Sequence, residues 1–239
     1  IRFRRSSRSW KPDTPNEDSS TDSFWNLLHY MPHGTRENGM NKMYLTIFYT
    51  PVIQHIFRLI AHSFLAFFGW KCLGHVPEER RYIVLAGPHT SNWDFPFMIA
   101  CASVIRARPY WLGKKAIFSF PFGAFFKWMG GYAIDRSKSN SLVDQMVTVY
   151  GEVDELCLLI PPEGTRQRRE QWKSGFYHIA QQANIPLVLG YLDYPKKEGG
   201  FGEVFRVTGD FEADMKYIQE FYGSKGAKFP ENFAGEFLD

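Results

Sequence analysis

The sequence predicts a single α/β domain with a central, mostly parallel sheet flanked by helices, preceded by an amphipathic membrane-associated helix. The length of 239 residues suits one good-sized domain with a real core. After residue 68, short apolar runs alternate with helix-like segments, which is typical of a sheet covered by helices. Before that point, the apolar residues 43–68 carry a polar stripe at helical spacing.

The amino-terminal 42 residues are predicted to form a disordered or loosely ordered arm. Residues 1–23 are polar, charged and rich in serine, with no hydrophobic period. Residues 24–42 mix aromatic side chains with Pro32, Gly34 and Gly39 and are interpreted as a linker. The first residue is isoleucine, so no prediction is made about a signal peptide.

Residues 43–68 form the first strong element and are predicted to be a helix lying in the membrane interface. His55, Arg58 and His62 are spaced by three and four residues, so they share one helix face in an otherwise largely apolar segment. A spanning helix normally avoids such a stripe at its centre, whereas an interfacial helix turns it toward water. Pro51 is expected to kink or break the segment. A helix packed on the domain and a short spanning anchor are the alternatives.

The remaining elements follow from the hydrophobic pattern. Apolar runs predict strands at residues 82–86, 110–113, 156–160, 187–192 and 204–208. Longer segments predict helices at residues 93–105, 139–153, 175–182 and 212–222. Residues 225–239 are interpreted as a loop or C-terminal tail.

Composition narrows the class of partner. Aromatic residues make up 17% of the chain, which indicates lipid contact or a large apolar cavity, with a Phe-rich core as the alternative. Basic residues are clustered at residues 2–11 and 166–173, as suits phosphate groups. No known nucleic-acid motif accompanies these clusters, so lipid head groups are favoured over nucleic acid. The three cysteines lack CxxC spacing, which argues against a disulfide framework or a zinc site and favours a reducing compartment.

The first candidate site is GPHTSNWDF, residues 87–95, which directly follows a predicted buried strand. His89 and Asp94 therefore lie just outside the carboxyl end of a strand, where α/β folds build their sites. Residues five apart point about 140° away from each other on one helix, so these two meet only if the chain turns between them. Pro88 and the polar residues 90–92 provide such a turn, and Asp94 would then orient His89 as a base. A capping Asp beside an unrelated loop His is the alternative.

Two further segments contain glycine turns. PPEGTRQRR, residues 161–169, follows the predicted strand 156–160, and its Arg166 can grip a phosphate in bidentate fashion. A solvated basic loop is the alternative. In GGYAIDRS, residues 130–137, the two glycines let the backbone pass close to another group, and Asp135 with Arg136 is by itself a weak signal.

Together these segments resemble the glycerolipid acyltransferase family, which contains the 1-acylglycerol-3-phosphate acyltransferases and related lysophospholipid acyltransferases. Four of the family's motifs occur in order: His-x4-Asp, a Gly-rich turn ending in Asp-Arg, Glu-Gly-Thr-Arg after a Pro, and an aliphatic-Pro-aliphatic step. The residues that match them are, in that order, His89 and Asp94; Arg136; Glu163, Gly164, Thr165 and Arg166; and Pro186. The resemblance covers roughly residues 70–192.

The resemblance implies that residues 69–224 are an acyltransferase domain that moves a fatty acyl group from acyl-CoA or acyl-carrier protein to a lysophospholipid hydroxyl. His89 and Asp94 would be catalytic, while Arg136 and Arg166 would hold the acceptor phosphate beside the turn at Gly164 and Thr165. Glu163 would bind a glycerol hydroxyl or orient Arg166. The resemblance also implies a peripheral or monotopic membrane protein facing the cytoplasm, with acyl-CoA or acyl-carrier protein as co-substrate and no cofactor. No metal is expected, because no cluster of ligating residues occurs in the sequence.

Two positions depart from the family's pattern. Pro88 stands where phospholipid-making members usually carry Asn, and Pro161 where Phe is common. These departures bear on the identity of the acceptor, and a non-phosphate lyso-lipid is one alternative. A non-catalytic lipid-binding relative is another, although such a protein would typically lose His89 or Asp94. A serine or cysteine hydrolase is disfavoured because there is no GxSxG and Cys157 sits in the middle of a predicted strand. The oligomeric state is not predicted.

Overall fold

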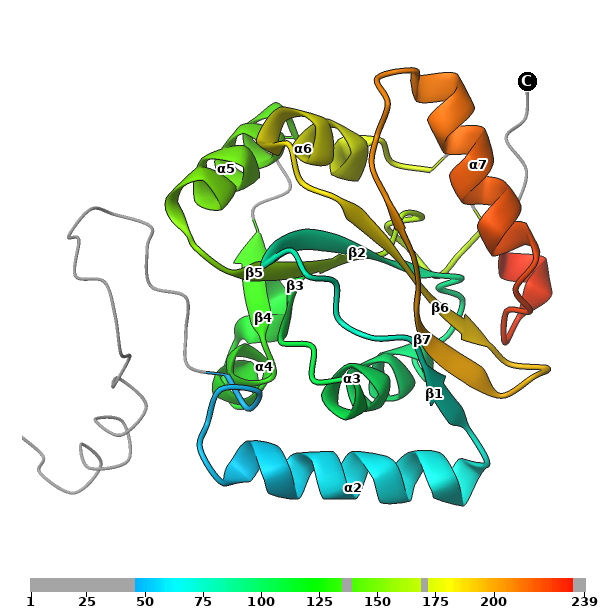
Figure 1. The fold of residues 1–239 in the computed structure, drawn as a ribbon. Helices are drawn as coiled ribbons and strands as arrows, with labels where there is room; N and C mark the ends of the chain where they lie inside the picture. The colour runs from blue at the N-terminus through cyan, green and yellow to red at the C-terminus, as the bar shows by residue number, and fades with distance from the viewer. Residues whose placement is uncertain (1–45, 135–138, 169–171, 234–239) are drawn as a thin grey trace, which may run out of the picture. The chain divides into compact units, whose positions relative to one another are not determined.

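A seven-stranded sheet with the order β1-β7-β6-β2-β5-β3-β4 organises the fold (Figure 1). The computed structural model describes residues 46–134, 139–168 and 172–233. Neighbouring strands are parallel except β6 and β7, which are antiparallel, so the predicted α/β domain with a mostly parallel sheet is confirmed. The strands are β1 (Lys71–Leu73), β2 (Arg81–Gly87), β3 (Pro109–Lys114), β4 (Gly131–Ile134), β5 (Leu156–Ile160), β6 (Leu187–Asp193) and β7 (Glu198–Phe205).

Helices cover both faces of the sheet. Figure 1 shows α5, α6 and α7 on one face and α3 on the other, with α2 lying across α3 as an outer layer. The helices are α2 (Ile53–Phe68), α3 (Asp94–Val104), α4 (Gly123–Trp128), α5 (Ser139–Glu152), α6 (Gly175–Ala183) and α7 (Phe211–Gly223), with short 3₁₀ turns η1 (Lys115–Phe118) and η2 (Pro230–Asn232).

The central strands are buried on both faces, and β2 illustrates why the sequence reveals them. Ile83 and Leu85 belong to the core under α5, α6 and α7, whereas Val84 and Ala86 belong to the core under α3. A parallel strand covered on both sides reads as an unbroken apolar run. For this reason the predicted runs 82–86 and 156–160 agree with β2 and β5.

The strand predictions need correction at the sheet edges. Residues 204–208 were predicted as a strand, but β7 spans Glu198–Phe205 and begins in a glycine-rich stretch. Gly200 has φ +137°, and a Cβ there would lie 2.0 Å from the Leu73 carbonyl oxygen, so glycine permits β7 to approach β1. The short strands β1 and β4 were not predicted, because edge strands of three or four residues carry little periodic signal.

Of the helix predicted at residues 43–68, residues 43–45 lie outside the described residues, and turns at residues 47–52 precede α2. The break falls at Pro51, as expected, because proline lacks the N–H that continues a helix. α2 ends at Gly69, which adopts the left-handed conformation with φ 73°. None of the helices in the described ranges combines the length and hydrophobicity needed to cross a bilayer.

One side of α2 packs on α3, and the opposite side is apolar and exposed. Ala61 and Leu65 are buried against α3 residues such as Phe97. The predicted polar stripe borders this contact, since Arg58 Nε donates a 3.1 Å hydrogen bond to the carbonyl oxygen of Ser103. The exposed apolar side chains of α2 include Ile56, Leu59, Ile60 and Phe67.

Part of the predicted C-terminal tail, residues 225–239, packs against the domain. Ala227 is buried, and the Phe229 N–H donates a 3.2 Å hydrogen bond to Thr90 Oγ1. Residues 225–233 therefore belong structurally with the domain that was predicted to end at residue 224.

Candidate active site

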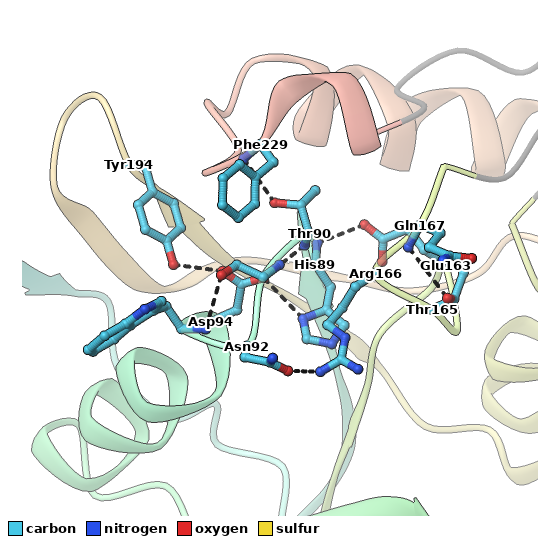
Figure 2. A network of polar contacts seen from close by, with 12 residues as sticks. His89, Thr90, Asn92, Asp94, Glu163, Thr165, Arg166, Gln167, Tyr194 and Phe229 are labelled. Carbon is cyan, nitrogen blue, oxygen red and sulfur yellow. Dashed lines mark hydrogen bonds and ion pairs between the residues drawn. The ribbon is translucent and has the colours of Figure 1, made fainter.

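Three neighbouring parallel strands bring the candidate residues to one edge of the sheet. β2 lies between β5 and β6, so the carboxyl ends of these strands meet. His89 follows β2, Glu163 follows β5 and Tyr194 follows β6. Figure 2 shows side chains from these segments converging there, as expected of an α/β sheet.

A turn between His89 and Asp94 brings their side chains together. His89 Nδ1 lies 3.1 Å from Asp94 Oδ2. The turn is held by Ser91 Oγ, which accepts a 3.1 Å hydrogen bond from the Trp93 N–H. Asp94 is the first residue of α3, and its Oδ2 also accepts 2.8 Å hydrogen bonds from the N–H groups of Thr90 and Ser91. Asp94 thus stabilises the turn, as a capping residue would, and also contacts His89, as an orienting residue would. Both interpretations that the sequence left open therefore apply to Asp94.

The protonation of this pair follows from the groups around the carboxylate. Asp94 is fully buried, and its second oxygen, Oδ1, accepts a 2.7 Å hydrogen bond from the Tyr194 hydroxyl. An ionised carboxylate offers only lone pairs, so His89 Nδ1 carries the proton that lies between them. His89 Nε2 is then left with a lone pair, and the side chain is 18% exposed. This arrangement suits a general base.

Glu163 supports the loop that carries His89. Its Oε1 accepts a 3.0 Å hydrogen bond from the backbone N–H of His89. Its Oε2 is buried and has no hydrogen-bond partner within the described part of the chain. Burial raises the pKa of Glu163 to about 7, against the opposing effect of the hydrogen bond from His89. Glu163 is therefore poised to titrate near neutral pH.

Arg166 links the segment after β5 to the segment after β2 through a hydrogen bond to Asn92. Its guanidinium donates a hydrogen bond to Asn92 Oδ1, beside His89 in Figure 2, and the residue is exposed. Gly164 has φ +65°, the left-handed conformation that the tight turn before Arg166 requires. Thr165 Oγ1 accepts a 3.4 Å hydrogen bond from the Gln167 N–H, which also stabilises this loop. Arg166 pairs with Asn92 in this arrangement, while Glu163 contacts His89.

The glycines of GGYAIDRS act in packing. A Cβ on Gly130 would lie 2.4 Å from the Pro109 carbonyl oxygen, and one on Gly131 would lie 2.5 Å from the Phe118 ring. These glycines let β4 pack closely against the start of β3 and against η1, as the sequence analysis anticipated in general terms. Arg136 lies outside the described residues, so its role stays a prediction.

A cavity lies elsewhere in the domain. It has a volume of about 490 Å³ and is lined by residues of α2 and of the segments that precede β2, β3 and β5, including Arg58, Glu79 and Arg108. Its lining mixes basic and acidic side chains, and Arg108 is already paired with Glu155 at 3.6 Å. Within the described ranges no group of three or more His, Cys, Asp or Glu side chains could hold a metal ion. The candidate residues His89 and Asp94 lie at the carboxyl ends of the strands instead.

Three contributors to the site escaped the sequence analysis. Asn92 and Thr90 lie inside the first motif, but the sequence predicts them only as turn or helix-capping residues and not as partners of Arg166 and Phe229. Tyr194 follows the last predicted strand of the region that resembles the family, and no local pattern distinguishes it from a surface tyrosine. Its position depends on the pairing of β6 with β2, which only the tertiary structure reveals.

Comparison with known proteins agrees with the motifs. Residues 72–189 match the family model described as Acyltransferase. The 1-acyl-sn-glycerol-3-phosphate acyltransferase alpha of Homo sapiens is 27% identical over 142 residues, which cover 53% of this chain and 47% of that protein. The 1-acyl-sn-glycerol-3-phosphate acyltransferase of Saccharomyces cerevisiae is 30% identical over 142 residues, covering 56% and 44%. The match thus spans just under half the length of these curated relatives.

The fold has a counterpart among solved structures. The crystal structure of the 1-acyl-sn-glycerophosphate (LPA) acyltransferase PlsC from Thermotoga maritima superposes with a TM-score of 0.51, at 15% identity, over 74% of this chain and 82% of that chain. The likeness to PlsC concerns the fold, and the ordered motifs and the family match concern the sequence. The chain belongs to the PlsC-like glycerolipid acyltransferase family.

Proposed function

We propose that this protein transfers a fatty acyl group from acyl-CoA or acyl-carrier protein to a hydroxyl of a lysophospholipid, with 1-acylglycerol-3-phosphate as the leading acceptor. The observation that carries the proposal is the His89–Asp94 pair, 3.1 Å apart at the carboxyl edge of the sheet. The names of the relatives, at 27% and 30% identity, support the class of acceptor.

In the proposed reaction His89 acts as both base and acid. Its Nε2 accepts the proton of the acceptor hydroxyl while the hydroxyl oxygen attacks the thioester carbonyl carbon. The C–O bond forms, the C–S bond breaks, and the proton passes from His89 to the departing thiolate sulfur. Asp94 stabilises the imidazolium that exists between these two steps. No acyl-enzyme is formed, so the enzyme's main contribution is to hold both substrates in line.

Arg166 is proposed to hold the acceptor phosphate. Its exposed guanidinium is kept next to the His89 loop by Asn92, which leaves other N–H groups of the planar fork available to an anion. Arg136 is proposed as a second phosphate ligand on the strength of its motif. Glu163 is proposed to bind a glycerol hydroxyl of the acceptor, which would satisfy its buried Oε2, for which the described residues supply no partner.

We also propose that the protein associates with membranes through apolar side chains on two neighbouring segments. In α2, Leu59 and Phe67 are 69% and 84% exposed. In the aromatic segment around α4, Phe120 and Phe122 are 97% and 65% exposed. Large apolar groups so exposed are typical of interaction surfaces, and an interfacial helix presents such a face to lipid.

The direct test is an assay of the purified chain. Vesicles containing a panel of lyso-lipids, with and without phosphate, are incubated with acyl-CoA or acyl-carrier-protein thioesters, and the products are measured by mass spectrometry. We expect phosphatidic acid from 1-acylglycerol-3-phosphate, and no product with the His89→Ala variant. A folded wild-type protein that acylates only lyso-lipids without phosphate would overturn the assigned acceptor. One that acylates none would overturn the assigned activity.

A further inference from the structure

A tyrosine that follows β6 contacts the buried carboxylate on the side away from His89. The Tyr194 hydroxyl donates a 2.7 Å hydrogen bond to Asp94 Oδ1, while Oδ2 faces His89 Nδ1 at 3.1 Å. Figure 2 shows the carboxylate of Asp94 between these two side chains. With the N–H groups of Thr90 and Ser91, Tyr194 completes a set of four contacts on a carboxylate that has no access to water.

We propose that Tyr194 is a positioning residue for the His89–Asp94 pair: its hydroxyl holds the carboxylate so that Oδ2 stays directed at Nδ1. The inference rests on the proposed function of His89 as base. Tyr194 does not reach the reacting atoms itself. It acts through Asp94, as hydrogen-bonded partners commonly orient a catalytic or ligating side chain.

The chemistry of the hydroxyl suits this role. Burial, together with the hydrogen bond to Asp94, raises the pKa of the Tyr194 hydroxyl above its usual value, so the group stays protonated and donates. Without this donor, Oδ1 would be a buried anionic oxygen with no partner among the described residues. A buried charge left without a hydrogen bond is costly and would seek another arrangement.

Contacts from outside the matched motifs hold Tyr194 in place. Its ring meets the edge of Trp70, with centroids 4.9 Å apart, and its N–H donates a 2.8 Å hydrogen bond to the Gly226 carbonyl oxygen. Lys228 Nζ lies 5.7 Å from the centre of the ring. Nearby in sequence, Phe229 bonds to Thr90 Oγ1, so the segment 226–229 is tied to both Tyr194 and the His89 turn. Residues 194 and 226–229 all lie beyond the region 72–189 that matches the family.

Replacing Tyr194 by Phe keeps the ring and removes only the donor. A carboxylate with one hydrogen bond fewer is less stabilised as an anion, so the pair binds its extra proton more tightly. We expect the acid limb of the kcat/KM profile to move to higher pH by about 0.5–1 unit. We expect kcat to fall about 3- to 10-fold with little change in the acceptor KM, because orientation of the base is impaired while acceptor binding is not. The other charged or titratable groups nearest the pair are Glu163, Arg166 and Lys228, and all three stay in place.

Tyr177→Phe is the matched control. The Tyr177 hydroxyl donates a 2.9 Å hydrogen bond to the buried carboxylate of Asp214, between α6 and α7, so this change removes the same kind of contact away from His89. We expect it to lower thermal stability and to leave the pH profile alone. Replacement of Tyr194 by para-aminophenylalanine, which keeps a donor at the same ring position, is expected to restore most of kcat.

A readout that needs no turnover separates this inference from the proposed function. The titration of the His89 ring is followed by NMR, with its signal assigned by comparison with His89→Gln, in wild-type protein and in Tyr194→Phe. We expect its midpoint to rise by about 0.5–1 pH unit in the variant, even if the protein proves to act on another substrate. If Tyr194→Phe loses stability as Tyr177→Phe does but leaves the His89 titration, the acid limb and kcat unchanged, Tyr194 is only structural and the inference is wrong.

Discussion

His89 Nδ1 lies 3.1 Å from Asp94 Oδ2 although Asp94 begins α3 and His89 precedes it by five residues. The contact exists because Asp94 also accepts hydrogen bonds from the N–H groups of Thr90 and Ser91, which fold the chain back on the carboxylate. The same carboxylate therefore shapes the turn and contacts the proposed base. Variants at either residue should separate these two contributions.

Loss of the base should abolish transfer while the fold is kept. We expect His89→Ala to lower kcat by about 10²–10⁴-fold, the usual contribution of a positioned general base. The side chain is only partly buried, so thermal stability should change little. Steady-state kinetics and a melting curve check both parts. Wild-type turnover by this variant would rule out the proposed mechanism.

Asp94→Asn should cost less activity than His89→Ala. The remaining amide oxygen can still accept from the turn and from His89, while the amide NH₂ can face Tyr194, whose hydroxyl is able to rotate and accept. The base is retained but loses the anion that stabilises the imidazolium. We expect a fall in kcat with an unchanged acceptor KM. A loss as large as that of His89→Ala would mean that the charge of Asp94 is indispensable.

Arg166→Lys tests the phosphate clamp. Lysine keeps the charge but loses the planar fork, so we expect the acceptor KM to rise by about tenfold with a smaller change in kcat. Arg168→Lys, at an exposed basic residue of the same loop, is the control and should leave KM alone. If Arg166 is structural, through its bond to Asn92, the variant will instead melt at a lower temperature with an unmoved KM.

Glu163→Gln tests the buried acid through stability. Folded Glu163 keeps its proton up to about pH 7, whereas the ordinary pKa is 4.5, so folding of the wild type loses free energy as pH rises between these values. The loss integrates to about 3 kcal/mol. The glutamine variant cannot ionise and does not lose this free energy. Its stability relative to wild type should therefore increase from pH 4.5 to pH 7 and then level off. Denaturant unfolding at several pH values measures this. A constant difference would contradict the raised pKa.

The exposed face of α2 should govern membrane binding. Leu59→Glu combined with Phe67→Glu places charges on that face without touching the contact with α3, and we expect at least about tenfold weaker sedimentation with liposomes. Val204→Glu, on β7, introduces the same charge at an apolar residue that is 49% exposed and should leave binding unchanged. Equal binding by all three proteins would exclude α2 as the main contact.

Deleting residues 1–68 is a less selective test of the same surface. The deletion removes Ala61 and Leu65, which are buried against α3, and so uncovers apolar side chains such as Phe97. We therefore expect the truncated domain to aggregate rather than remain in solution. A monodisperse truncated domain with undiminished liposome binding would show that another surface carries the membrane contact.

Local sequence patterns were sufficient for the central strands and for the turn between His89 and Asp94. β2 and β5 lie under helices on both faces, and such strands must be apolar throughout. An unbroken apolar run in the sequence therefore predicts where each of them lies. His89 and Asp94 are joined by hydrogen bonds within six residues of chain, so their contact is also a local property. The motif order then identified the family before any distance was known.

Edge strands and long-range partners required the tertiary structure. β1 and β4 are too short for a periodic signal, and Gly200 in β7 reads as a loop residue because its need for glycine comes from the neighbouring strand. The sequence does not reveal which face of α2 is buried, because the circumference of this helix is largely apolar. Only its contact with α3 decides which side is covered. The pairing of Arg166 with Asn92 likewise depends on β2 and β5 being neighbours.

By itself the sequence determined the class of fold, the family and the pair His89–Asp94, because each is encoded by residues close together in the chain. Only the tertiary structure decided what surrounds that pair. Tyr194 and Phe229 reach the turn from 100 and 139 positions away from their partners Asp94 and Thr90, through strand order and the docking of the C-terminal segment. Such contacts are selected by the packing of the whole sheet, and no local pattern carries them.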